Sequence, residues 1–335
     1  MNEDMLDTQF DRLLTGYWIS QAIHVAAKLG LGDALKNGPR TAEELAKLAG
    51  AHAPSLYRLL RGLASVGLFA EDDKHRFALT ALGARLRGDV AGSKRALAIM
   101  TGEEHYRACA EMLYSVQTGK PAFDKVCGMP IFDFLSRYPE KSKVFDEAMV
   151  GVHGRETGAM LDAYDFTGIG VLADVGGGNG SVLTAILARY PMMHGILYDL
   201  SGVADRAKAG IQAAGLAGRC QVMAGSFFES VPEGADAYIM RHIIHDWDEE
   251  KSIRILRNIH RSMKPDARLL IVEGVIPPGD DPSFEKLLDL AMLILTGGKE
   301  RTETEYRSLF NAGGFRLTRI VPTRAGVSVL EGHKM

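Results

Sequence analysis

The chain is poor in cysteine and in long apolar runs, and each shortage excludes a class of protein. Its three cysteines, Cys109, Cys127 and Cys220, form no Cys-x-x-Cys pair. A disulfide scaffold and a thiolate-bound metal are therefore excluded. The longest unbroken apolar run covers only residues 290–295, whereas a membrane-spanning helix needs about 20 apolar residues. The sequence thus predicts reduced thiols in a chain that does not cross a membrane.

Neither sign of charge dominates. Lysine and arginine total 39 and aspartate and glutamate total 42, a formal net charge of -3. Because no global basic field attracts polyanions, nucleic acid and anionic membranes are not expected as partners. The first residues, Met-Asn-Glu-Asp, lack the basic start and apolar stretch of a secretory signal. We therefore expect a cytoplasmic protein.

Residues 1–95 show the pattern of a small helical domain. Apolar side chains recur at helical spacing over residues 5–29 and form a wide face that needs a partner. A capping box at Thr41 begins a further helix, another begins at Pro54, and apolar segments within 68–79 flank an acidic turn, as in a hairpin. Helix, turn, helix and hairpin is the order of a winged helix.

A winged helix raises the question of DNA binding, because the second helix of such motifs enters the major groove. That helix, residues 54–66, offers only Arg58 and Arg61 as cations, and the hairpin tip is acidic. Protein association is therefore favoured over DNA recognition. A DNA-binding regulator stays open as an alternative.

The pattern changes near residue 163. Residues 96–162 are helical and are expected to form a linker that contributes to a substrate pocket, while residues 163–335 alternate short apolar runs with helical stretches. This alternation predicts an α/β domain, with a parallel sheet covered by helices on both faces. The expected strands are 171–175, 196–198, 221–223, 238–240 and 269–272, with 316–321 and 326–330 as an antiparallel edge pair.

The first of these strands runs into a glycine-rich turn. Gly176, Gly178 and Gly180 stand in Gly-x-Gly-x-Gly spacing, where the backbone turns tightly and admits a ligand. Ser181 occupies the position at which a dinucleotide fingerprint needs glycine, which disfavours a nicotinamide cofactor. Asp199 ends the next strand, where a carboxylate can bind both hydroxyls of a ribose. A nucleoside-containing ligand is expected, and Asp174 is either a second polar contact or a strand-end carboxylate.

A histidine cluster follows the fourth strand. Within residues 241–248, His245 is placed to act as a base toward a substrate. Imidazole and carboxylate groups in this segment also suit zinc or iron. However, Asp248 fits the acidic first turn of a helix over 249–263, and no metal is expected. Glu273 ends the fifth strand after four apolar residues, so its carboxylate needs a partner such as an imidazole N–H.

Five motifs, taken together in order and spacing, resemble the small-molecule O-methyltransferases that use S-adenosylmethionine, the family of the caffeic acid and acetylserotonin methyltransferases. The motifs are Gly-Gly-Gly-Asn-Gly at 176–180, Tyr-Asp-Leu with Asp199, His-Asp-Trp with His245, Ile-Val-Glu-Gly with Glu273, and Gly-Gly-Lys-Glu-Arg-Thr with Glu300. The resemblance covers nearly the whole chain. It implies a Rossmann-like class I methyltransferase domain of seven strands, the last antiparallel, over residues 163–335. It also implies a winged-helix domain that forms a homodimer and does not bind DNA.

The family's functional positions carry over one by one, with S-adenosylmethionine as cofactor. The implied catalytic residues are His245 as general base, with Glu273 and Glu300 as the carboxylates that bracket it. The cofactor contacts are expected at Asp174, Gly176 (methionine part), Gly178, Asp199 (ribose), Ser226 and Phe227 (adenine) and Arg241 (near its other edge). The acceptor pocket is expected at Phe145, Met149, Asp246 and Met292. Plant members usually have aspartate in place of Ser226 and lysine in place of Arg241.

A phenol loses its proton only near pH 10, so a base must assist its attack at neutral pH, and an imidazole with its ordinary pKa near 6.5 is suitable. We expect direct in-line attack on the sulfonium methyl group, with Glu273 and Glu300 fixing the tautomer of His245. Phenol, enol and heteroaromatic nitrogen all stay open as acceptors. Some relatives instead hydroxylate, decarboxylate or rearrange their substrates, and the intact catalytic set disfavours that alternative.

Overall fold

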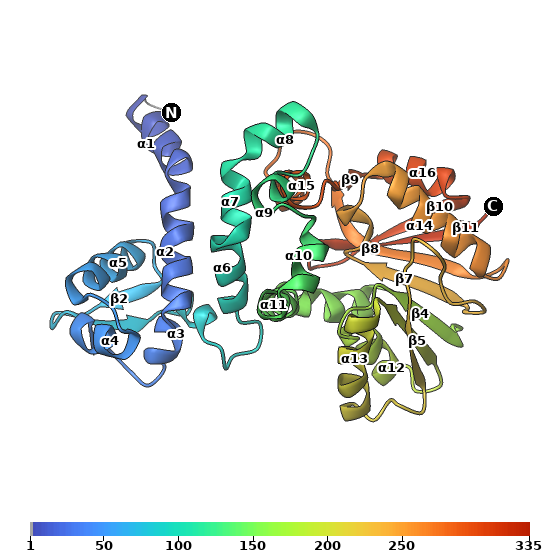
Figure 1. Ribbon diagram of the computed structural model, residues 1–335, viewed down its shortest axis with the longest axis horizontal. Helices are drawn as coiled ribbons and strands as arrows, with labels where there is room; N and C mark the ends of the chain where they lie inside the picture. The colour runs from blue at the N-terminus through green and yellow to red at the C-terminus, as the bar shows by residue number, and fades with distance from the viewer. Residues whose placement is uncertain (1–2) are drawn as a thin grey trace. The chain divides into compact units, whose positions relative to one another are not determined.

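The computed structural model describes residues 3–335. The chain divides into two compact units. Unit 1 comprises the residues up to Ala110 together with Met129–Gly154, and unit 2 comprises Glu111–Gly128 and Arg155–Met335. One boundary between the units falls inside the long helix α11 (Pro139–Ala163), which is labelled in Figure 1. Over residues 3–335, no helix combines the length and apolarity that crossing a bilayer requires.

Unit 1 is helical around a small antiparallel sheet with the strand order β1-β3-β2. Its elements, besides the first part of α11, are α1 (Glu3–Leu14), α2 (Gly16–Lys28), α3 (Leu31–Ala34), β1 (Arg40–Thr41), α4 (Ala42–Ala49), α5 (Ala53–Ser65), β2 (Phe69–Glu71), β3 (Arg76–Leu79), η1 (Gly83–Leu86), α6 (Arg95–Gly102), α7 (Glu104–Ala110) and α10 (Ile131–Arg137). The expected capping box forms between Thr41 and Glu44. The expected hairpin is β2 paired with β3.

One helix was expected over residues 5–29, and the structure has two. The break falls at Thr15 and Gly16, which are both weak helix formers. The Thr15 hydroxyl donates a hydrogen bond to the carbonyl of Asp11 (2.6 Å), a side-chain bond that competes with a regular helix. The wide apolar face is nevertheless exposed: Phe10, Leu13 and Trp18 keep 65%, 75% and 62% of their surface open.

Unit 2 is built on one mostly parallel sheet. The strands follow the order β10-β11-β8-β7-β4-β5-β6, and the short β9 pairs with β8. Neighbours from β8 to β6 run parallel, whereas β11 is antiparallel to both β8 and β10. The strands are β4 (Val171–Val175), β5 (His194–Asp199), β6 (Cys220–Ala224), β7 (Ala237–Arg241), β8 (Arg268–Ile276), β9 (Arg301–Thr302), β10 (Phe315–Pro322) and β11 (Val327–Lys334). The expected α/β sheet with its antiparallel edge pair is confirmed.

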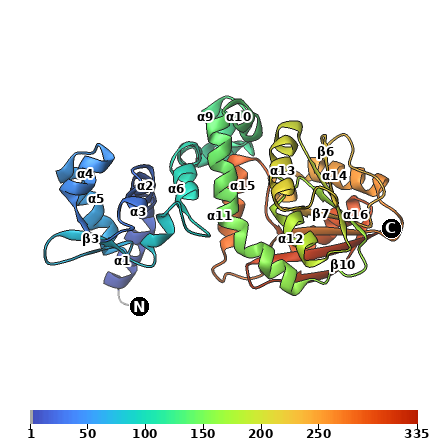
Figure 2. The same ribbon diagram turned by 90° about the horizontal axis from the view of Figure 1, so that it is seen from below.

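Helices cover both faces of this sheet (Figure 1, Figure 2). The helices of unit 2, besides the end of α11, are α8 (Met112–Thr118), α9 (Ala122–Cys127), α12 (Ser181–Arg189), α13 (Ser201–Ala213), η2 (Ile244–Asp246), α14 (Glu249–Ser262), α15 (Phe284–Leu295) and α16 (Glu303–Ala312). Successive strand residues point to opposite faces. Leu172 therefore packs in the cluster of α12 and α13, while its neighbour Ala173 packs in the cluster of α14 and α16.

The strand β4 lies at the topological switch point of the sheet. It is the first strand of the unit in sequence, and it pairs with β5 on one side and β7 on the other. Chain connections leave these strands in opposite directions, which opens a crevice at their carboxyl ends where ligands bind in such folds. The glycine turn, Asp199 and the histidine cluster all follow carboxyl ends at this edge.

Candidate active site

The glycine turn after β4 is shaped by its backbone. Gly176, Gly178 and Gly180 all have positive φ angles, of 75°, 57° and 78°, a conformation that side chains disfavour. A Cβ atom on Gly176 would lie 2.5 Å from the Ile243 side chain, whereas one on Gly178 would meet open space. The turn therefore needs glycine for its conformation and, at position 176, for close packing.

Asp199 and Asp174 place two carboxylates against this turn. Asp199 ends β5, and its carboxylate accepts hydrogen bonds from the backbone N–H groups of Gly178 (2.8 Å) and Leu200 (2.7 Å). Asp174 is 2% exposed, and within residues 3–335 its Oδ2 atom has no hydrogen-bond partner. Burial raises the pKa of Asp174 to about 7, although the charge of Arg241 opposes the shift. The turn thus combines bare backbone with two carboxylates.

Phe227 lies beside the glycine turn. Its ring edge would be 3.7 Å from a Cβ atom on Gly176, and its ring packs edge-on against Trp247 with centroids 6.0 Å apart. The side-chain amide of Asn258 donates to the Phe227 carbonyl at 2.7 Å and fixes this segment. The neighbouring Ser226 accepts a bond from the backbone N–H of Phe228 at 3.3 Å. Contacts of Ser226 and Phe227 with adenine stay predictions.

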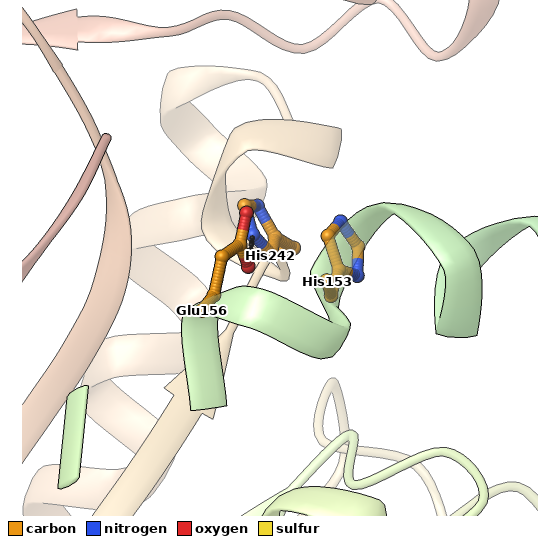
Figure 3. Close-up of side chains that lie close together, drawn as sticks. All are labelled: His153, Glu156 and His242. Atoms are coloured by element: carbon orange, nitrogen blue, oxygen red, sulfur yellow. Dashed lines mark hydrogen bonds and ion pairs between the residues drawn. The ribbon is translucent and has the colours of Figure 1, made fainter. Parts of the chain in front are cut away.

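Arg241 and His242 join the end of β7 to α11. The Arg241 guanidinium donates to the Thr157 hydroxyl at 2.8 Å. Figure 3 shows His242 facing Glu156, with a 2.8 Å contact between Nε2 and Oε2. His242 has a φ of +53°, which is unusual for a residue with a side chain. The sequence gives no signal for the pairing with Glu156, because helix periodicity alone does not mark that residue.

His245 is the best-defined acid-base group of the site. It lies in η2, is 7% exposed, and its Nδ1 atom is 2.6 Å from Oε1 of Glu300. Its Nε2 atom is 3.8 Å from Oδ1 of Asp246. Because Glu300 accepts at Nδ1, the tautomer that fits this contact carries its proton there and leaves Nε2 as the acceptor. The expected pairing of His245 with Glu300 is formed.

The charges around His245 favour its protonated form. Burial alone would lower the pKa of His245, but the carboxylates of Asp246, Glu300 and Glu273 outweigh it and raise that pKa to about 10. Burial also raises the pKa of Glu300, and the facing imidazole opposes this in part. The pair therefore holds at least one proton at neutral pH. The pKa of His245 is well above the ordinary imidazole value on which the sequence analysis relies.

Glu273 has a different partner from the one expected. The fifth strand continues to Ile276, so Glu273 lies inside β8 instead of at its end, and it is fully buried. Its Oε1 accepts from the backbone N–H groups of Ile243 (3.1 Å), Ile244 (2.6 Å) and His245 (3.2 Å). Its Oε2 accepts from the Tyr306 hydroxyl at 2.7 Å. Glu273 therefore binds the backbone of the His245 loop, residues 243–247, where an imidazole N–H was expected.

Side chains that suggested a metal are directed to separate partners. Asp248 is the N-cap of α14, and its carboxylate accepts from the Lys251 backbone N–H at 2.8 Å. His242 contacts Glu156, and His245 contacts Glu300. Asp248 is thus used in helix capping, and each of the two imidazoles faces a carboxylate. That the site binds no metal stays a prediction.

The expected acceptor residues are divided between the two units. Phe145 and Met149 lie one turn apart on the part of α11 that belongs to unit 1, and Met292 lies on α15 in unit 2. Asp246 adjoins His245, and burial raises its pKa to about 7 against the opposing effect of that imidazole. The pocket that these residues would line stays a prediction.

Comparison with protein families matches both parts of the chain. The O-methyltransferase domain family matches residues 110–316, and the O-methyltransferase dimerisation domain family matches residues 11–88. A phenazine O-methyltransferase of Lysobacter antibioticus is 46% identical over 322 residues, which cover 96% of this chain and 94% of that protein. A mitomycin biosynthesis 6-O-methyltransferase of Streptomyces lavendulae is 40% identical, with 94% and 90% covered.

A solved structure leads to the same family. It is an O-methyltransferase from neocarzinostatin biosynthesis in complex with S-adenosylmethionine and 2-hydroxy-5-methyl naphthoic acid. This chain is 35% identical to it, with a TM-score of 0.85, and the match covers 94% of this chain and 96% of that one. The likeness thus includes fold, cofactor class and sequence together.

Proposed function

This chain belongs to the O-methyltransferase family and uses S-adenosylmethionine as its methyl donor, and we propose that it methylates a phenolic hydroxyl with His245 as general base. The observation that carries the proposal is the buried His245–Glu300 pair at the same sheet edge as the glycine turn and Asp199. An imidazole fixed at one nitrogen presents the other to a substrate proton.

The residues of the glycine turn fit this donor. The bare backbone at Gly178 leaves space where a Cβ atom would meet nothing. The buried Oδ2 of Asp174, which lacks a hydrogen-bond partner within residues 3–335, offers an acceptor to a cationic or N–H-bearing group. Asp199 stands at a strand end where a carboxylate can bind ribose hydroxyls. We assign Asp174, Gly176, Gly178 and Asp199 to the donor, and Ser226, Phe227 and Arg241 to its adenine end.

In the proposed mechanism His245 accepts the proton of the acceptor hydroxyl at Nε2. The raised pKa of His245, about 10, is close to that of a phenol, so the proton transfer is nearly balanced. When bound, S-adenosylmethionine would supply a methyl group on a positively charged sulfonium, and its charge would favour the neutral form of the imidazole. Glu300 stabilises the imidazolium as it forms, and Glu273 holds the backbone that carries the ring.

We propose a small aromatic acceptor with more than one ring. The relatives described above act on phenazine and mitomycin-related compounds or bind a naphthoic acid. A phenol on such a system is a better proton donor than an aliphatic alcohol, which suits a base of this strength. Phe145, Met149, Asp246 and Met292 are proposed to line its pocket.

The direct test is turnover. The purified protein is incubated with labelled S-adenosylmethionine and a panel of hydroxyphenazines, hydroxynaphthoic acids and simple phenols, and products are identified by mass. We expect methyl ethers of at least one panel member. Hydroxylated, decarboxylated or rearranged products without methyl transfer would instead support the non-methylating alternative. Donor binding is measured separately by calorimetry.

We also propose that the chain forms a homodimer through its N-terminal domain, residues 1–95, which contains the segment 11–88 that matches the dimerisation domain family. Phe10, Leu13 and Trp18 form an exposed apolar face on α1 and α2, larger than isolated apolar residues on a monomer surface would give. Light scattering on the wild type and on Leu13→Glu tests this. A monomeric wild type contradicts the homodimer proposal.

The DNA-binding alternative is tested separately, by a gel shift with random duplex DNA.

A further inference from the structure

A guanidinium is fully buried next to the catalytic pair. Arg301 is 0% exposed and directly follows Glu300, in the short strand β9. Removing a charge from water costs several kcal/mol unless hydrogen bonds and countercharge compensate. Its one ion pair within residues 3–335 is with Glu249, at 3.4 Å, and that carboxylate is half exposed. Countercharge alone therefore does not explain why this side chain is an arginine.

Most acceptors of Arg301 belong to the His245 loop or to the residues that hold it. Nη1 donates to the carbonyl of Ile244 at 3.3 Å, and Nη2 donates to the carbonyl of Trp247 at 3.3 Å. These carbonyls flank His245 and Asp246 on either side. Nη2 also lies 3.2 Å from the hydroxyl of Ser252, which itself donates to the Trp247 carbonyl at 3.2 Å. Each of these distances is long for a hydrogen bond. The binding of the loop by Arg301 therefore depends on the number of contacts and on the planar shape of the guanidinium.

The same short segment touches the loop at two further points. A Cβ atom on Gly298 would lie 1.9 Å from the His245 carbonyl oxygen, so the two backbones approach as closely as glycine allows. Glu300 contacts the His245 ring at Nδ1. Residues 298–301 therefore reach the loop backbone, the imidazole and the flanking carbonyls, while Glu273 accepts hydrogen bonds from the loop's N–H groups.

We propose that Arg301 is a positioning residue for methyl transfer, whose buried guanidinium binds the carbonyls of Ile244 and Trp247 and thereby holds His245 against Glu300. The inference rests on the proposed role of His245 as base. A lysine keeps the charge but offers a single ammonium in place of a planar fork, so it does not reach both carbonyls. Arg301→Lys thus separates positioning from charge.

Arg219 provides a matched control. Its guanidinium also binds backbone carbonyls, those of Met193 (2.8 Å) and Leu187 (3.2 Å), but at the amino ends of β5 and β6, opposite to the site. Arg219→Lys removes an equivalent fork far from His245. Both variants are expected to lower thermal stability. A structural role alone would lower stability in both variants without a shift in the pKa of His245.

The experiment measures kcat at saturating substrates, the Kd of S-adenosylmethionine by calorimetry, and the pKa of the His245 imidazole by NMR. For Arg301→Lys we expect kcat to fall about 10- to 100-fold, the scale on which small misplacements act, with the Kd within about twofold of wild type. The pKa of His245 should fall, because the ring moves away from Glu300. Arg219→Lys should change neither kcat nor that pKa.

A folded Arg301→Lys protein with wild-type kcat and an unchanged pKa of His245 overturns the inference. If that variant does not fold, Ser252→Ala decides, because it removes the hydroxyl that links Arg301 to the loop. It should lower kcat and the pKa of His245 in the same direction, and no change in either overturns the proposal. If the wild type methylates no acceptor, the proposed function fails. The NMR measurement of the His245 pKa in the wild type and in Arg301→Lys still tests whether Arg301 positions His245.

Discussion

The two halves of the candidate site are built in different ways. On the donor side, three glycines lie in one turn, and the carboxylate of Asp199, 21 residues after Gly178, binds N–H groups of that turn and of its own neighbour. On the acceptor side, the His245 loop is held by side chains from separate segments, Glu273 in β8, Glu300 and Arg301 near β9, and Tyr306 in α16. The glycine turn and Asp199 are the closer in sequence and form a local half, whereas the contacts of the His245 loop span 28 to 57 residues and form a tertiary half.

This difference has a functional meaning. A ligand can displace the N–H bonds that Asp199 makes with the turn, because the carboxylate stands at a strand end and is half-buried. The base is enclosed, and its direction is fixed before substrate arrives, which is the condition for near-attack geometry. We therefore expect substitutions on the donor side to change binding, and those on the base side to change kcat.

The largest effect is expected for His245→Ala. General-base assistance contributes about 10²- to 10⁴-fold, so kcat should fall by that order. Donor affinity by calorimetry should stay within about twofold, because the imidazole contributes to a later step. His194→Ala, an exposed histidine at the start of β5, is the control. Wild-type turnover in His245→Ala would remove the residue from the mechanism.

The converse substitution on the donor side is Asp199→Ala. Hydrogen bonds to a charged group contribute about 1.5 to 3 kcal/mol, so the Kd for S-adenosylmethionine should rise about 10- to 150-fold. At saturating donor, kcat should recover most of its wild-type value. Asp205→Ala changes an exposed carboxylate on α13 that pairs with Lys208, and serves as control. A collapse of kcat with unchanged Kd would reverse the assignment of the two halves.

The pH profile is a third way to separate the halves. His245 acts as base only when deprotonated, so turnover rises with pH through its pKa, and neighbouring carboxylates raise that pKa. Glu300→Gln removes one of them, so the midpoint of the rise should move to lower pH, by about one unit, which corresponds to about 1.4 kcal/mol. The plateau should also fall, because the ring loses a charged partner.

Glu303→Gln is the control for that experiment. It removes a carboxylate three residues away that is exposed and paired with Arg307. Its pH profile should match the wild type, since solvent screens exposed charges. A midpoint that does not move in Glu300→Gln, or that moves upward, would show that this carboxylate does not set the basicity of His245.

The sequence predicts the local half of the site well and the tertiary half only in part. Asp199 ends its strand as expected, because alternating strands and helices bring all carboxyl ends to one edge. The sequence correctly places Glu273 near His245. The strand β8 nevertheless continues beyond its apolar run, because the Glu273 carboxylate is buried and accepts hydrogen bonds from backbone N–H groups. Hydropathy alone does not detect a buried, fully bonded carboxylate.

Other features are not visible to periodicity or spacing. Arg301 lies within the motif that carries Glu300, and Tyr306 follows that motif by four residues. A charged residue in a loop, such as Arg301, is normally expected to be exposed. The Arg301 guanidinium donates to carbonyls that are more than 50 residues away in sequence. The Tyr306 hydroxyl donates to a carboxylate that is 33 residues away. The sequence also does not predict the helix break at Thr15, because the hydrogen bond of the Thr15 side chain competes with an otherwise helical pattern.

The smallest expected effect, and the sharpest test of the tertiary half, comes from two buried tyrosines on the same face of the sheet. The Tyr306 hydroxyl donates to Oε2 of Glu273, while the Tyr238 hydroxyl donates to the Pro232 carbonyl at 2.7 Å. Both side chains are 0% exposed. Replacing either by phenylalanine removes one buried hydrogen bond and no carbon atom, so urea unfolding should show similar losses of about 1 to 3 kcal/mol.

Only the Tyr306→Phe protein should also lose activity, because Glu273 loses its second partner and holds the His245 loop less firmly. We expect a few-fold decrease of kcat, with donor Kd unchanged and Tyr238→Phe at wild-type turnover. Equal turnover in the two variants would mean that Glu273 needs no support from Tyr306. The hydrogen bonds from the backbone N–H groups of the His245 loop to Glu273 would then be sufficient without Tyr306. Fewer segments of the chain would hold the loop than the geometry indicates.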